Sequence, residues 1–152
     1  MPRENEHEFV SKCLMGEPNA VAFCGSLFRV SQVIDDLVDQ DKPVSKDSVK
    51  EAFWECLIEI PRNPFYQRHF NQLLPQIQVF FNDWLDSCDL EKKGDHEKNI
   101  AFVLRDSIGS IIAHCAYILG GYRWMREVSV MIREHIHEDT LEEYKEGLGG
   151  GV

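Results

Sequence analysis

The sequence predicts an all-α protein, a single helical bundle of about five to seven helices, and three observations support this class. Apolar residues recur at the three- and four-residue spacing of amphipathic helices, and no useful stretch alternates as a β-strand does. Prolines and glycines fall between the periodic segments, where helices end. The 152 residues, 43% hydrophobic and 28% charged, suit one domain of ordinary globular composition.

In the first half of the chain, capping residues and prolines set the expected helix boundaries. Gly16 and Pro18 end the first helix, and Asn19 is suited to cap the second. Pro43 ends that second helix, and Ser45 is suited to cap the third. The sequence therefore predicts helices over residues ~4–15, ~20–40 and ~46–60.

In the second half, one expected helix contains a proline and another ends at two glycines. Pro75 should kink or split its helix. The polar run Asp86–Lys98 predicts a mobile loop, and Gly120 with Gly121 should break the long helix after it. Helices are expected over residues ~64–87, ~97–119, ~122–136 and ~139–146. The domain should span residues 1–146, followed by a flexible glycine-rich tail over 147–152.

Charge, hydropathy and cysteine content exclude several functional classes. Asp and Glu outnumber Lys and Arg by 26 to 16, and the net charge of −10 is opposite to the basic footprint of a nucleic-acid binder. The apolar runs are short and interrupted by charge, so no membrane span is expected. The start MPRENEHEF lacks the apolar core of a secretion signal. Five cysteines without a CxxC pair predict reduced thiols and a cytosolic protein.

An acidic cluster near the end of the second expected helix is the first candidate for chemistry. Asp35, Asp36 and Asp39 lie within about one turn of one another. They stand at a helix C-terminus, where the macrodipole is already negative and like charges repel. A hard cation with oxygen ligands would offset this repulsion. An exposed acidic helix end is the alternative interpretation.

The third expected helix is amphipathic. Its acidic side carries Glu51, Glu55 and Glu59, each about one turn from the next. Its apolar side carries Phe53, Trp54, Leu57 and Ile58. We therefore expect the acidic side to face water and the apolar side to face the core.

A second group of polar residues follows one side of the helix expected over ~97–119. Asp106, Ser110 and His114 are spaced i, i+4 and i+8, so their side chains should form one line along the helix. Asn99 and Tyr117 lie toward the same side. Such a line can coordinate a metal or hold a polar ligand, and it is also typical of a solvated helix face.

The run DDLVD, from Asp35 to Asp39, has the form DDxxD and is similar to the first aspartate-rich motif of the class I isoprenoid synthases. This all-α family contains prenyl diphosphate and terpene synthases. Its second metal motif has Asn or Asp, then Ser or Thr four residues later, then Glu four residues further. Asp106 and Ser110 match the first two places, and His114 occupies the third.

The resemblance implies a central cavity in which Mg²⁺ ions bridge carboxylates to a substrate diphosphate. The metal ligands that it implies are Asp35, Asp36, Asp39, Asp106 and Ser110.

The resemblance also implies roles for residues around the diphosphate. His114 would form a hydrogen bond or act as a general acid or base, because an ordinary imidazole pKa of about 6.5 suits proton transfer near neutrality. Arg29 would act beside it as a catalytic phosphate contact, and Arg105 would bind the substrate in the same way. Asn99 and Tyr117 would orient the ligand.

Three functions are therefore open. The first is Mg²⁺-dependent binding or turnover of a diphosphate-containing small molecule. The second is non-catalytic, an acidic helical protein that binds a protein partner or a second copy of itself. The third is an all-α nucleotide pyrophosphohydrolase, to which Asp36 and Asp39 followed by Glu51 and Glu55 give a loose similarity. Convergence of the carboxylates in one cavity would favour an enzyme, and scatter over the surface would favour the binding protein.

Overall fold

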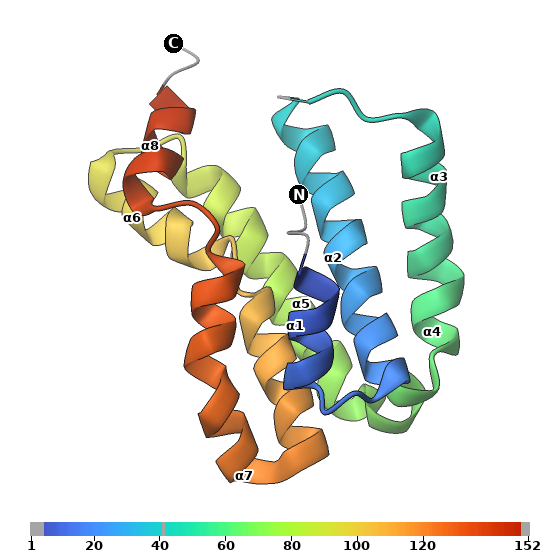
Figure 1. Ribbon diagram of the computed structural model, residues 1–152. Coiled ribbons are helices and arrows are strands. Elements are labelled where there is room, and N and C mark those ends of the chain that lie inside the picture. The colour runs from blue at the N-terminus through green and yellow to red at the C-terminus, as the bar shows by residue number, and fades with distance from the viewer. Residues whose placement is uncertain (1–4, 41, 150–152) are drawn as a thin grey trace. The chain divides into compact units, whose positions relative to one another are not determined.

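Helices form nearly all of the chain that the structure describes, residues 5–40 and 42–149 of a computed structural model (Figure 1). These residues contain no strand, so the predicted all-α class is confirmed. The chain divides into two compact units, Met1–Phe70 and Asn71–Val152, and each has its own core.

The first unit is built around a helical hairpin. A short helix, α1 (Glu6–Cys13), precedes α2 (Pro18–Asp39). Next come α3 (Lys46–Trp54), a π-helical turn η1 (Glu55–Glu59), the single turn α4 (Ile60–Arg62) and the start of α5 (Pro64–Leu90). In Figure 1, α2 and α3 run side by side in opposite directions, and both α3 and η1 pack on α2.

Side-chain caps fix three of these helix starts. Ser45 accepts a hydrogen bond from the Ser48 N–H over 3.0 Å, which confirms the predicted cap of α3. The predicted cap of α2 is wrong, because α2 begins earlier and the Glu17 carboxylate accepts from the Ala20 N–H over 2.5 Å. Asn19, the residue expected there, lies inside α2 and accepts at its carbonyl from the side chain of Asn63 over 2.9 Å.

The core of the first unit is aromatic where α5 begins. The buried ring of Phe23 stacks on Tyr66 with 5.5 Å between centroids, and Phe65 lies 6.4 Å from Phe23. Asn63 is also buried, and its Oδ1 accepts from the Tyr66 N–H over 3.0 Å. This residue therefore caps α5 and joins α5 to the start of α2.

Helix α5 departs from helical geometry at His69 (φ −120°, ψ 18°) and not at Pro75 itself. A proline has no N–H for the carbonyl four residues earlier, so the helix is weakened on the N-terminal side of Pro75. The His69 ring packs on Phe65 with 4.9 Å between centroids.

The second unit contains the rest of α5, then α6 (Asp95–Leu104), α7 (Ile108–Ile136) and α8 (Leu141–Gly149). Gly121 has φ 79° and ψ −173°, so the predicted break at the glycine pair is confirmed. A Cβ at Gly120 would lie 2.7 Å from side-chain atoms of Trp124, which explains why a glycine stands there. The fully buried residues of this core include Leu73, Ile111, Ile112, Cys115, Val128 and Ile132.

Three boundary predictions in the second unit are wrong. The helix expected over 97–119 is interrupted at residues 105–107, between α6 and α7. The expected mobile loop over 86–98 is largely helical, because α5 continues to Leu90 and α6 begins at Asp95. The expected tail begins inside α8, which continues to Gly149, and residues 150–152 lie outside the described residues.

One stretch of the described chain, Asp95–Leu148, contains an 18-residue window of mean hydropathy 1.3, apolar and long enough to cross a membrane. The core helix of a compact protein passes the same test of length and composition, and 39% of this window is buried inside the structure. Helical geometry is interrupted within the stretch at residues 105–107 and at Gly121. The expected absence of a membrane span therefore stays a prediction.

Candidate functional site

The DDxxD cluster lies at the C-terminal end of α2, in the first unit. Asp35 and Asp36 are half-buried and Asp39 is exposed. The side-chain amide of Gln32 donates to Asp36 Oδ1 over 3.3 Å, one turn away along the same helix. Within residues 5–40 and 42–149, no group of three His, Cys, Asp or Glu side chains could hold a metal ion. Magnesium binding stays a prediction.

The second expected metal motif does not form a line along one helix. Because α6 ends at Leu104 and α7 begins at Ile108, Asp106 lies in the turn between them, and the single helix that was expected to carry it with Ser110 and His114 is interrupted. Asp106 Oδ2 instead lies 3.0 Å from Nδ1 of His137, near the end of α7. Ser110 is exposed on the first turns of α7.

Of the residues expected around the diphosphate in the second unit, the structure brings His114 and Tyr117 into contact with each other, and Arg105 is engaged by a different residue. His114 Nε2 lies 2.8 Å from Gln72 Oε1, and its ring packs beside the exposed Tyr117 with 5.8 Å between centroids. Asn99 is half-buried, and its Oδ1 is covered without a hydrogen-bond partner among the described residues. Arg105 forms an ion pair with Glu91, with 3.1 Å between Nη1 and Oε1.

A polar cluster that the sequence did not predict joins α8 to the rest of the second unit. It consists of Glu91, Arg105 and Tyr144, and we call it the α8 cluster. The Tyr144 hydroxyl donates to Glu91 Oε1 over 2.6 Å, and the Arg105 guanidinium carbon lies 5.1 Å from the Tyr144 ring centre. Burial, together with the hydrogen bond to the Glu91 carboxylate, raises the pKa of Tyr144 above its ordinary value of 10.0.

Phe102 connects the α8 cluster to the Asp106–His137 contact. Its ring centroid lies 4.8 Å from His137 and 5.3 Å from Tyr144. Burial lowers the pKa of His137 below its ordinary value of 6.5, and the positive charge of Arg133 lowers it further. Glu91, His137 and Tyr144 come from three separate segments, so no spacing rule of a single helix could have grouped them.

The third expected helix departs from its prediction at four residues, whereas Glu51 is exposed as predicted. Phe53, Trp54 and Leu57 are 63%, 55% and 68% exposed, whereas the side chain of Glu55 is only 12% exposed. The expectation that the apolar side faces the core is therefore wrong for these three residues. We call Phe53, Trp54 and Leu57 the aromatic face of α3–η1.

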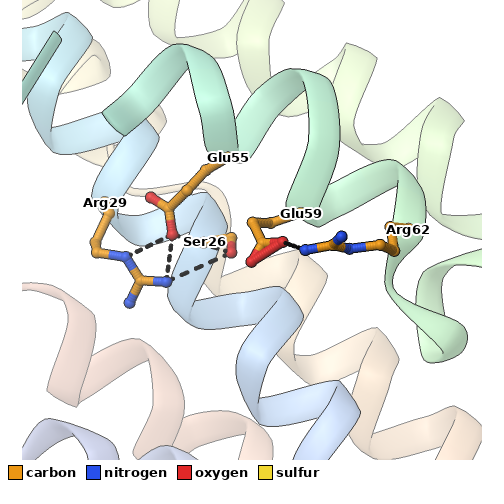
Figure 2. A network of polar contacts seen from close by, with 5 residues as sticks. All are labelled: Ser26, Arg29, Glu55, Glu59 and Arg62. Carbon is orange, nitrogen blue, oxygen red and sulfur yellow. Dashed lines mark hydrogen bonds and ion pairs between the residues drawn. The ribbon is translucent and has the colours of Figure 1, made fainter. Parts of the chain in front are cut away.

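Figure 2 shows what Glu55 contacts. Its Oε1 accepts from Arg29 Nε over 2.8 Å, from Arg29 Nη2 over 2.5 Å and from the hydroxyl of Ser26 over 3.3 Å. Both donors belong to α2, and Ser26 is buried there. Glu59 and Arg62, also drawn in Figure 2, pair with each other along η1 and α4. The expected phosphate contact, Arg29, is thus engaged by a carboxylate of its own chain.

The π-helical turn accounts for part of this orientation. The Ile60 N–H bonds to the Glu55 carbonyl, five residues back, so the turn holds one residue more than an α-helical turn. Pro61 follows directly and has no N–H for the Leu57 carbonyl. The extra residue turns the segment about its axis, and Glu55 at its start meets α2.

No known protein family, curated protein or solved structure shows significant similarity to the chain. The functional proposal therefore rests on the structure alone, and in particular on the exposed aromatic face.

Proposed function

We propose that the protein is a non-catalytic binding module that docks a helix of a partner protein on the aromatic face of α3–η1. The observation that carries this proposal is the exposure of Phe53, Trp54 and Leu57, each more than half accessible on neighbouring turns. Contiguous exposed apolar side chains mark interaction sites more often than isolated ones do. Aromatic side chains supply a large share of the energy in protein interfaces.

The spacing of the face suits a helical partner. Lys46 and Lys50 precede Phe53, Trp54 and Leu57 at i, i+4, i+7, i+8 and i+11, the spacing of one stripe along a helix. Such a stripe is a ridge that packs against an amphipathic helix, with charged contacts at its N-terminal end and apolar contacts at its C-terminal end.

The charges of the stripe indicate the chemistry of that partner. Lys46 and Lys50 are exposed, and neither has an ion-pair partner within the described part of the chain. Carboxylates on the partner helix would therefore complement the stripe. A second copy of this chain fits less well, because it brings the same lysines and a further net charge of −10.

Two synthetic helical peptides test the proposal. Both carry the same leucine stripe, flanked by glutamates in one and by lysines in the other, and binding to the full chain is measured by calorimetry. We expect the glutamate peptide to bind. Phe53→Ser or Leu57→Ser should lower the affinity for this peptide by about tenfold or more.

The matched control is Val79→Ser, which removes a similarly exposed apolar side chain from α5. It should leave peptide affinity unchanged. Equal binding of both peptides would show that Lys46 and Lys50 do not select an acidic partner. Binding that survives Phe53→Ser and Leu57→Ser would show that the interface lies elsewhere.

A further inference from the structure

We propose that α7 docks by its central turn on an anionic lipid surface, in the headgroup layer and without crossing the bilayer. The contact surface, which we call the α7 tip, consists of Tyr117, Tyr122, Arg123 and Arg126. It belongs to the second unit, so this inference does not depend on the docking of a helix on the aromatic face of α3–η1.

The first step is the shape of α7. Gly121, with φ 79° and ψ −173°, divides the helix into two halves, and Figure 1 shows that the second half runs back beside the first. A Cβ at Gly109, in the first half, would lie 3.7 Å from the side chain of Ile132 in the second half, so the two halves pack on each other. The turn is therefore the end of a helical hairpin, and such an end can reach a surface ahead of the rest of the unit.

The second step is the exposure of two tyrosines at the α7 tip. Tyr117 is 45% exposed before the turn, and Tyr122 is 67% exposed directly after it. Neither hydroxyl has a hydrogen-bond partner among the residues that the structure describes. A tyrosine combines an apolar ring with a hydroxyl that prefers water, and this combination is enriched where a membrane meets water.

The third step is the charge of the α7 tip. Arg123 and Arg126 are exposed, and neither has an ion-pair partner within residues 5–40 and 42–149. No Asp or Glu occurs from Ser107 to Arg126, although the chain as a whole carries a net charge of −10. The α7 tip is therefore locally basic, and basic side chains are attracted to the negative surface of anionic lipids.

The arrangement of these residues favours a lipid surface over a partner helix. The α7 tip takes its residues from both sides of a turn, so it does not form the ridge along one helix that packs against another helix. Binding to a lipid interface needs only exposed apolar surface together with attraction to the headgroups. The net charge of −10 sets the orientation, because an anionic surface repels the acidic remainder of the chain and attracts the basic end.

The test measures sedimentation of the full chain with lipid vesicles. One set of vesicles contains phosphatidylcholine alone, and the other contains phosphatidylcholine and phosphatidylserine in a ratio of about two to one. We expect the chain to bind the mixed vesicles about tenfold more tightly, and to lose this preference at high salt. Arg123→Gln and Arg126→Gln should each lower the affinity for the mixed vesicles by about fivefold. Tyr122→Ser should weaken binding to both sets.

Two matched controls remove similar side chains from the first unit. Arg68→Gln deletes an exposed arginine and makes the same change in net charge as the substitutions at the α7 tip. Phe53→Ser deletes a ring that is 63% exposed, close to the exposure of Tyr122, from the aromatic face of α3–η1. Neither control should change the binding to vesicles. Circular dichroism of every variant verifies that its helices are retained.

Failure of the unsubstituted chain to bind the mixed vesicles overturns the proposal, and so does equal binding to both sets. Vesicle binding that falls in the controls as much as in the α7 tip variants overturns it too, because the contact would then lie elsewhere. Binding to soluble polyglutamate without binding to vesicles would assign the surface to an acidic protein and reject the lipid. These outcomes are separate from the proposed function, which the leucine-stripe peptides and Phe53→Ser decide.

Discussion

The hydroxyl of Tyr144 donates to the carboxylate of Glu91 over 2.6 Å, although 53 positions of sequence separate the two residues. Arg105 completes the contact, since it pairs with the same Glu91 oxygen and lies against the Tyr144 ring. Lys145 adds an ion pair to Asp95, with 2.8 Å between Nζ and Oδ1. The C-terminal helix α8 is therefore held in the second unit by polar contacts as well as by the packing of Phe102.

Removal of the Tyr144 hydroxyl should destabilise the second unit. Tyr144→Phe leaves the ring in place and deletes a hydrogen bond to a charged group, so we expect the free energy of unfolding to fall by about 1–2 kcal/mol. Urea denaturation followed by circular dichroism measures this change. Tyr122→Phe, at a highly exposed tyrosine, is the control and should have no effect.

The same hydroxyl predicts a pH dependence. The pKa of Tyr144 is raised in the folded chain, so the unfolded chain ionises first as the pH rises above 10.0. The contribution of the Tyr144 hydroxyl to the free energy of unfolding is fully present below pH 10.0 and is lost as the pH rises from there toward the folded-state pKa. Tyr144→Phe should therefore reduce the loss of stability at alkaline pH, and an identical loss in both proteins would contradict the assignment.

His137 should make the second unit sensitive to acid. Its folded-state pKa is lowered by burial and by Arg133, so the unfolded chain takes up the proton first as the pH falls below 6.5. The stabilising contribution of the neutral imidazole is present above 6.5 and is lost as the pH falls toward the folded-state pKa. Urea denaturation at pH values on either side of 6.5 measures the effect, and His137→Gln should diminish it.

Asn63→Ala should destabilise the first unit by about 1–2 kcal/mol. The substitution removes the cap of α5 at Tyr66 and the bond to the half-buried Asn19, whose carbonyl loses its side-chain donor. Thermal unfolding measures the change against Asn71→Ala, which alters an exposed position of α5. Equal effects of the two substitutions would show that the cap contributes nothing.

Two phenylalanines of the first unit should respond very differently to truncation. Phe23→Ala empties a fully buried site and should cost about 3–5 kcal/mol. Phe53→Ser should change the free energy of unfolding by no more than about 0.5 kcal/mol, because its ring is already mostly in water. Chemical denaturation of both variants tests the exposed orientation of the aromatic face, and a large cost at Phe53 would refute it.

A melting scan with Mg²⁺ and pyrophosphate separates the binding module from the diphosphate hypothesis. A ligand that binds only the folded chain raises the melting temperature. The binding module predicts no shift, in agreement with the lack of a three-residue metal group among the described residues. A rise that Asp36→Asn abolishes, with helicity unchanged, would instead support the magnesium site.

Local chemistry predicted much of the helical framework. Ser45 alone was sufficient to predict the start of α3, and the pair Gly120 and Gly121 was sufficient to predict the break in α7. Caps and residues of positive φ act within a few positions of sequence, so the sequence shows them directly. The turn at residues 105–107 was missed because the apolar periodicity continues through it. Periodicity alone cannot show where tertiary packing interrupts a helix.

The orientation of the candidate site residues depends on contacts with residues of the same chain that are distant in sequence. Those contacts could not be predicted from the sequence. Helix periodicity predicted that Glu55 faces water. In the structure, Arg29 and Ser26 on α2 donate hydrogen bonds to its carboxylate and hold it inward. Asp106 was aligned with Ser110 by spacing, and the fold places its Oδ2 3.0 Å from Nδ1 of His137 instead. Helix periodicity describes one element at a time, whereas these orientations are set by what the neighbouring element offers.

Helix α5 begins in the first unit and ends in the second, and this has a practical consequence for fragments of the gene. A truncation after Phe70 would keep about two turns of that helix, Pro64–Phe70, and so short a stub frays at its open end. The aromatic contact of Tyr66 with Phe23 would then lie at a loose terminus. Shortened versions intended for isotope labelling or crystallisation should therefore retain the chain through Leu90.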